Sequence, residues 1–146
     1  MEINKYVELK EKQQKEFNEL SEKIMFFAFS EEQFDEGLAK FGIKRKNMKD
    51  KILRFGNTGG YLLKDKEHEI DAMFEKHRNE LKHEIDKDKT GKGFIRQMFD
   101  YELANHEYGY TGSLEETLDS VGLTAKSIEE NKALQKGLKL ALAKYN

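Results

Sequence analysis

The segment between Asp65 and Asp86 constrains the fold most, because its apolar residues recur every three or four positions. This spacing matches the period of roughly 3.6 residues of an α-helix and places the apolar side chains on one face. Asp65 suits the N-cap position, where its side chain would accept a hydrogen bond from a free backbone N–H. The segment therefore predicts a long amphipathic helix. Its inner face would hold Ile70, Met73, Phe74, His77, Leu81 and Ile85.

Further segments carry apolar residues at the same helical spacing. The first is polar all round in its middle, so we expect it to pack only at its two ends. Together with the segment described above, they give about six helices. The further predicted helices cover residues 3–23, 31–41, 94–106, 114–121 and 125–145.

Residues typical of helix ends flank several of these segments. Gly42 and Gly122 fit the position after a helix, where glycine adopts a positive φ at little cost. Helix starts are indicated by a Ser three positions before Gln or Glu, the pattern of a capping box, or by a lone Thr. These starts are Ser30 with Gln33, Ser113 with Glu116, and Thr124.

Three short apolar runs are too brief for helices and predict strands. Residues 52–55 and 61–64 flank the glycine-rich turn at 56–60, which is typical of a β-hairpin. The aromatic run at 24–29 is the natural third strand. We therefore expect a single domain over residues 1–146. Its fold class is α+β, mostly helical, with a small three-stranded antiparallel sheet around one core.

Composition limits the classes of function. The chain has 26 Lys plus Arg against 28 Asp plus Glu, a net charge of -2, so binding to nucleic acid would need a local basic patch. It has no Cys, which excludes disulfides, thiolate zinc sites and cysteine nucleophiles. No signal peptide and no membrane span is evident, so we expect a cytoplasmic protein that does not bind membranes.

A basic run between residues 44 and 54 is the strongest local charge feature. It contains six basic residues and one acid, Asp50. Such a run would contact phosphates or the acidic face of a partner, although basic loops are more often simply solvated. The stretch at 94–123 is its opposite, with one Arg and six acids, and would suit a basic groove. The basic candidates are Lys44, Arg45, Lys46, Lys49, Lys51 and Arg54.

A second candidate set follows the predicted helix at 94–106. Polar groups and two aromatic rings gather there within a few residues, which would suit a binding site at a helix end. The same side chains would also cap the helix and fix the following link, and we favour this structural interpretation. The set consists of Asn105, His106, Glu107, Tyr108, Tyr110 and Thr111.

Two features of the sequence weakly indicate metal binding. Glu102 and His106 are one helical turn apart, and Asp100, Glu107 and His77 would be possible neighbours, but spacing places no third ligand beside them. Residues 86–97 match part of an EF-hand loop, yet Gln97 stands where a calcium loop has Glu. We therefore expect no metal, no cofactor and no catalytic residues. A metal-dependent enzyme centred on Glu102 and His106 remains an alternative.

Residues 114–134 have the pattern of a helix-turn-helix, with Gly122 in the turn. Glu129 and Glu130 would then face the phosphates of DNA, which opposes binding. We favour a packed helical corner, and a DNA-binding regulator is the alternative.

Two motifs resemble a group of small proteins of phages, plasmids and other mobile elements of Gram-positive bacteria. They are MFFAFSEEQFDEGLAKFGI with the GNTGGYLL hairpin, and MFDYELANHEYGYTGSLEETLDSVGL leading to ENKALQKGL. The resemblance implies an accessory protein of the host cytoplasm and no catalytic assignment. We expect a non-enzymatic protein that binds a host or defence protein, or a protein–nucleic-acid complex. Inhibition of a defence system such as a CRISPR nuclease is one concrete form of this role.

Overall fold

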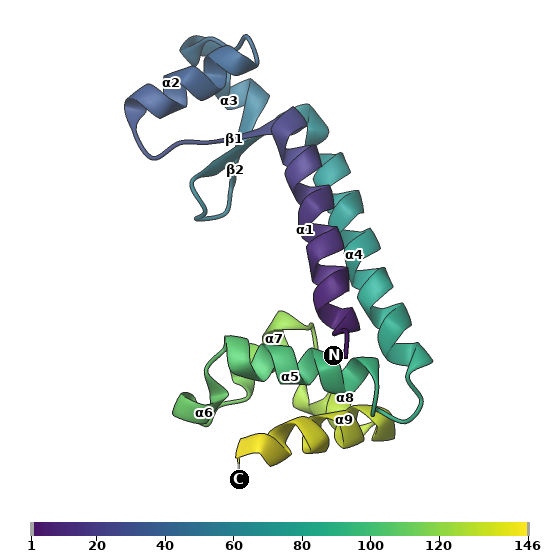
Figure 1. Cartoon of the computed structure of the whole chain (residues 1–146). Helices are drawn as coiled ribbons and strands as arrows, with labels where there is room; N and C mark the ends of the chain where they lie inside the picture. Colours follow the sequence, from purple (N-terminus) through teal and green to yellow (C-terminus); the bar gives the residue numbers. More distant parts are fainter. Residues whose placement is uncertain (1, 146) are drawn as a thin grey trace. The chain divides into compact units, whose positions relative to one another are not determined.

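The structure is a computed structural model that describes residues 2–145, and it is a mostly helical α+β fold with a three-stranded antiparallel sheet (Figure 1). The predicted fold class is confirmed. In chain order the elements are α1 (Lys5–Ile24), β1 (Met25–Phe27), α2 (Glu31–Lys40), η1 (Arg45–Asn47), α3 (Met48–Lys51), β2 (Ile52–Phe55), β3 (Gly60–Leu63), η2 (Lys64–Lys66), α4 (Glu67–Lys87), α5 (Phe94–Asn105), α6 (Tyr108–Thr111), α7 (Glu115–Ser120), α8 (Ala125–Glu129), α9 (Lys132–Leu142) and η3 (Ala143–Tyr145).

The described chain divides into two compact units. The sheet unit contains residues 13–78, and the helical unit contains residues 2–12 and 79–145. Helices α1 and α4 each contribute residues to both units. The prediction of a single domain is not tested by this division.

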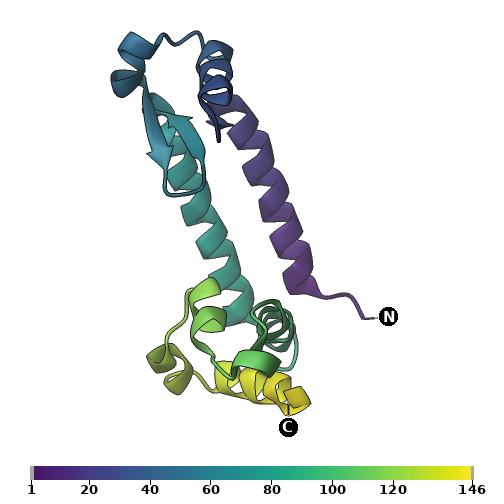
Figure 2. The same cartoon turned by 90° about the vertical axis from the view of Figure 1, so that its left-hand side faces the viewer.

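In the sheet unit, β3 pairs with both other strands and gives the order β1-β3-β2. Figure 2 shows the hairpin formed by β2 and β3. Gly56 and Gly59 in its turn have φ values of 56° and 83°, which glycine adopts without steric strain. The predicted hairpin and third strand are confirmed.

The two faces of the sheet bury different clusters, because successive strand residues point to opposite sides. On one face, Met25 and Leu62 pack with Ile70 of α4 and with partly buried Phe17 of α1. On the other face, Phe26 and Tyr61 pack with α2. With the cluster of the helical unit, the described residues form three hydrophobic clusters, so the expected single core is wrong.

Helix α2 lies directly against the aromatic ring of Phe26. Its N-cap is Ser30, whose hydroxyl accepts a hydrogen bond from the backbone N–H of Gln33, as predicted. The Gln33 side chain accepts from the N–H of Phe29 instead of from Ser30. A Cβ added at Gly37 would lie 2.0 Å from the Phe26 ring, so only glycine allows this close approach.

In the helical unit, α5 packs along α9 (Figure 1). Ile95, Met98, Phe99 and Leu103 of α5 are fully buried, which follows from their helical spacing. They pack in one cluster with residues of α9, and Leu134, Leu138 and Ala141 are its buried members from that helix.

A pair of glycines lets the loop before α5 approach α9 closely. A Cβ added at Gly91 would lie 2.0 Å from the carbonyl oxygen of Ala133. A Cβ added at Gly137 would lie 2.4 Å from Cγ2 of Ile95 and 2.8 Å from the carbonyl oxygen of Gly91. At these two glycines the backbone of the loop therefore lies directly against the backbone of α9.

The predicted last helix is wrong in one respect, because it is divided into α8 and α9. Thr124 caps α8 and forms a reciprocal capping box with Ser127. The side chain of Asn131 then accepts a hydrogen bond from the N–H of Leu134 and starts α9. Asn competes well for this capping position, and so it interrupts the apolar periodicity.

Two other predicted caps are wrong. Leu114 occupies the N-cap of α7, and the Ser113 hydroxyl accepts from the N–H of Glu115 in a local turn. Asp65 lies inside the 3₁₀ turn η2 that precedes α4.

No helix within residues 2–145 is both long and apolar enough to cross a membrane.

Candidate functional site

The predicted basic run forms η1, α3 and β2 of the sheet unit. These short elements place only three of the run's six basic residues in one groove. Arg45, Lys49 and Arg54 line one groove of about 730 Å³. Lys44, Lys46 and Lys51 are exposed but do not line it.

The groove also contains aromatic and apolar side chains that the sequence did not indicate as site residues. They come from the end of β1, from α2 and from both strands of the hairpin, and a helical or strand period alone does not bring them together. We call this surface the aromatic–basic groove. Its lining consists of Ala28, Phe29, Ser30, Glu31, Phe34, Arg45, Met48, Lys49, Ile52, Arg54 and Tyr61.

Arg45 is held by carboxylates of α2. It donates hydrogen bonds to Glu31 and, at 2.7 Å, to Asp35, and its guanidinium lies 5.2 Å from the centre of the Phe34 ring. The hydrogen bonds to Asp35 and Glu31 raise the pKa of Arg45 above its ordinary value. Arg45 thus pairs with both acids, and the two carboxylates together exceed its charge by one.

Lys49 and Arg54 differ from Arg45 because neither has an acidic partner within the described residues. Both side chains are exposed. An unpaired cation on a concave surface attracts anionic groups more strongly than one already in an ion pair. These two residues therefore give the groove its available positive charge.

Phe34 and Tyr61, which line the groove, belong to a group of packed aromatic rings. The Tyr61 ring stacks on Phe26 with centres 5.3 Å apart, and it meets Phe34 edge to face at 5.0 Å. Such ring pairs add stability beyond simple burial. Phe29 lies at the rim with 77% of its surface exposed.

The second predicted set lies in the helical unit, and the structure does not bring all its members together. Asn105 donates a hydrogen bond of 3.3 Å to Glu102, and His106 ends α5 with its Nδ1 3.6 Å from Glu116. Both side chains make structural contacts within the unit. The favoured interpretation, that these residues pin the helix end, agrees with this geometry.

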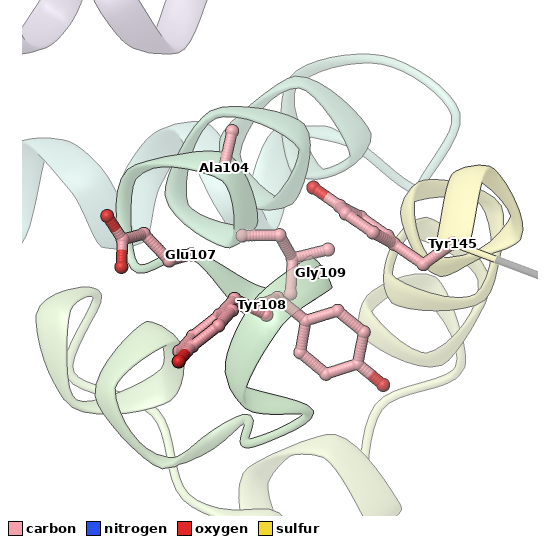
Figure 3. A pocket seen from close by; sticks show the side chains of 7 residues that line it. Ala104, Glu107, Tyr108, Gly109 and Tyr145 are labelled. Carbon is pink, nitrogen blue, oxygen red and sulfur yellow. The ribbon is translucent and has the colours of Figure 1, made fainter.

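Glu107, Tyr108 and Tyr110 of this set line a hollow of about 430 Å³, shown in Figure 3, whereas Thr111 does not line it. Tyr108 and Tyr145 meet edge to face with ring centres 5.1 Å apart, and Tyr110 is 91% exposed. Glu107 adopts a left-handed conformation with φ of 53° and begins α6, where we expected an irregular link. In Figure 3 its carboxylate lies on the opposite side of the hollow from Tyr145, so the two do not converge.

Glu102 is fully buried and is committed to contacts within the helical unit. Its carboxylate accepts a 2.8 Å hydrogen bond from the Tyr6 hydroxyl, lies 3.4 Å from Nζ of Lys10, and accepts from Asn105. Burial raises the pKa of the Tyr6 phenol, and the hydrogen bond to Glu102 raises it further.

These contacts bear on the alternative of a metal centre at Glu102 and His106. Among the described residues, neither belongs to a group of three His, Cys, Asp or Glu whose ligand atoms lie within 4.8 Å of one another. His77 belongs to the sheet unit, where its Nε2 lies 3.5 Å from Oε1 of Glu16. The arrangement around Glu102 is that of a buried structural carboxylate.

Asp88, at the third position of the EF-hand-like segment, organises that loop by itself. Its carboxylate accepts hydrogen bonds from the backbone N–H groups of Gly91, Gly93 and Ile95. Partial burial would raise the pKa of Asp88, but these hydrogen bonds outweigh it and hold the pKa below its ordinary value. Asp88 thereby satisfies the free N–H groups at the start of α5.

The helix-turn-helix pattern at 114–134 corresponds to α7, α8 and the start of α9. The would-be recognition helix α8 spans only Ala125–Glu129, and Glu129 and Glu130 are exposed beside it. This geometry gives no specific support to the alternative of a DNA-binding regulator.

The fold and the groove define a mostly helical α+β protein with a concave surface that combines aromatic rings and unpaired cations. The chain matches the family of unknown function DUF7659 over residues 5–144, and it belongs to that family. No curated protein and no solved structure matches it. A family without an assigned function fits the predicted resemblance, whereas an origin in mobile elements stays a prediction.

Proposed function

We propose that this chain is a non-enzymatic binding protein that holds an anionic macromolecular partner in the aromatic–basic groove. One observation carries the proposal: the unpaired cations Lys49 and Arg54 share a groove of about 730 Å³ with the exposed ring of Phe29. Cations give attraction and orientation, while a buried ring contributes most of the affinity at a typical interface.

The resemblance to mobile-element proteins supports a narrower form of this function. We propose that the chain acts in the cytoplasm of a bacterial host and occupies a host or defence protein or a protein–nucleic-acid complex. Inhibition of a defence system such as a CRISPR nuclease is the concrete case. Expression of the chain would then restore plasmid establishment in cells whose nuclease targets that plasmid.

Affinity purification of the tagged full chain tests the groove. The double variant Lys49→Glu, Arg54→Glu reverses both unpaired charges, and Lys126→Glu, Lys136→Glu makes the same change at exposed positions of the helical unit. We expect a partner that is recovered with the wild type and with the helical-unit variant and is lost with the groove variant.

Both double variants change only exposed side chains, so their unfolding midpoints should match that of the wild type. Recovery of the same partner with the groove variant would contradict the proposed function.

A further inference from the structure

The backbone at Phe29 is held by hydrogen bonds, although most of the residue's surface is exposed. Its backbone N–H donates a 2.7 Å hydrogen bond to Gln33, and the N–H of neighbouring Ala28 donates to the carbonyl oxygen of Gly59 at 2.9 Å. A Cβ added at Gly59 would lie 2.3 Å from Cε1 of the ring, so one side of the ring lies against the hairpin turn. A partner would therefore meet an exposed ring whose backbone is already ordered, which lowers the entropy cost of binding.

Two unpaired cations share the groove with this ring. Lys49 and Arg54 line the same groove and lack acidic partners within residues 2–145. Glu31, the acid that lines the groove, is paired with Arg45, as is Asp35 of the same helix. An anionic chain that passes through the groove would therefore meet two available cations.

An exposed aromatic ring beside a basic groove is the combination that binds single-stranded nucleic acid. Bases stack on such rings, and cations follow the phosphates of the backbone. A duplex keeps its bases stacked inside, where Phe29 does not reach them. An acidic peptide offers carboxylates to Lys49 and Arg54 but brings no obligatory planar group to the ring. The volume, about 730 Å³, suits a short segment of chain.

We propose that the aromatic–basic groove binds a single-stranded segment of nucleic acid, with one base stacked on Phe29 and the phosphates near Lys49 and Arg54. This inference rests on the proposed function and names its partner class. Recognition is independent of sequence, because every base offers a flat face to stack.

The absence of Trp from the chain allows a direct test of stacking. In the full-length Phe29→Trp variant, the introduced indole is the sole tryptophan, and a 20-nucleotide oligothymidylate should quench its fluorescence. The Tyr110→Trp variant places the same reporter at an exposed position of the helical unit and should show no change. Absence of quenching for Phe29→Trp at low salt would overturn the proposal.

Affinity measurements by fluorescence anisotropy complete the test with the same labelled oligonucleotide. We expect Phe29→Ala to weaken binding about tenfold or more. The pair Lys49→Gln, Arg54→Gln should weaken it and make its salt dependence shallower, whereas Lys126→Gln should not. Equal affinity for a duplex, or no effect of Phe29→Ala, would overturn base stacking.

A binding measurement with poly-glutamate of similar length separates failure of the nucleic-acid inference from failure of the proposed function. If it binds in a manner that depends on Lys49 and Arg54 while the oligonucleotide does not, the partner is an acidic protein. The nucleic-acid inference then fails and the proposed function of the groove stands. If neither probe binds, the inference also fails, and the affinity purification described above decides the proposed function separately.

Discussion

Asp86 in the last turn of α4 and Asp88 just after that helix lie two positions apart, but only Asp88 accepts hydrogen bonds from the backbone of the following loop. Its two carboxylate oxygens accept three backbone N–H groups, while Asp86 is exposed on the last turns of α4. A carboxylate satisfied in this way fixes the loop geometry and caps the next helix at once. The difference between these residues is one of local hydrogen bonding, which residue type alone does not indicate.

The Asp88→Asn variant should be less stable by about 1 kcal/mol at neutral pH, because an amide cannot accept all these hydrogen bonds. The folded-state pKa of Asp88 is lowered, so its contribution is complete above about pH 5 and is lost as the pH falls below roughly 3.9. Urea unfolding at pH 7 and pH 3 should therefore show a smaller difference between variant and wild type at pH 3.

Asp86→Asn is the matched control, since it makes the same chemical change two residues away. It should leave the free energy of unfolding within about 0.5 kcal/mol of the wild type at both pH values. Equal losses for the two variants would show that the backbone hydrogen bonds of Asp88 do not matter for stability.

Sequence reasoning succeeded where one residue type decides a backbone conformation. Gly42 and Gly122 have φ values of 67° and 70°, as predicted for the ends of their helices. It failed where a residue distant in sequence determines the environment of a side chain. Glu102 has the same pattern as any helical acid, yet Tyr6 and Lys10 of α1 make it a buried structural group. Phe29 became a candidate site residue only through the groove that residues of α2, α3 and the hairpin form with it.

At the scale of elements, long apolar periodicity predicted α4 and α5 well, because a repeated pattern over many residues outweighs single positions. The short strands were predicted from their apolar runs and from the glycine-rich turn between two of them. Short elements were less predictable. Asn131 divided one predicted helix into α8 and α9, and Glu107 started α6 inside a predicted link. The basic run was predicted as a candidate, but the groove required the turns of η1 and α3, which have no periodic signal.

The crossing of α5 and α9 depends on Gly137. Alanine has a helix propensity about 1 kcal/mol better than glycine, which alone would stabilise α9. A Cβ at this position meets Ile95 and the Gly91 carbonyl oxygen, so we expect Gly137→Ala to lower the free energy of unfolding by about 1–3 kcal/mol. Thermal and urea unfolding by circular dichroism measures the change.

Lys136→Ala is the control in the same helix, because this side chain is exposed. It should change the free energy of unfolding by no more than about 0.5 kcal/mol. A Gly137→Ala variant as stable as the wild type would show that the crossing tolerates a wider spacing.

For the whole molecule, the two compact units share their longest helices. Residues 5–12 of α1 belong to the helical unit and residues 13–24 to the sheet unit, and α4 is divided in the same way. Helix formation is cooperative along the chain, so loss of packing in one unit weakens helical turns of the other. This continuity favours the prediction of a single domain.

We expect one cooperative unfolding transition. The single-tryptophan variants Phe29→Trp and Tyr110→Trp report on the sheet unit and the helical unit, and their urea midpoints should coincide. Circular dichroism of each variant should give the wild-type midpoint, which checks that the reporters are harmless. Separate midpoints would establish two domains and contradict the prediction.

The strand order β1-β3-β2 has a consequence for biosynthesis. The strand that emerges last from the ribosome is the one that occupies the middle of the sheet. Until β3 appears, β1 has no neighbour on either edge, and its run of Met and Phe residues stays open to other nascent chains. Slow translation across residues 28–59 would therefore favour aggregation, and an early chaperone at β1 would counter it.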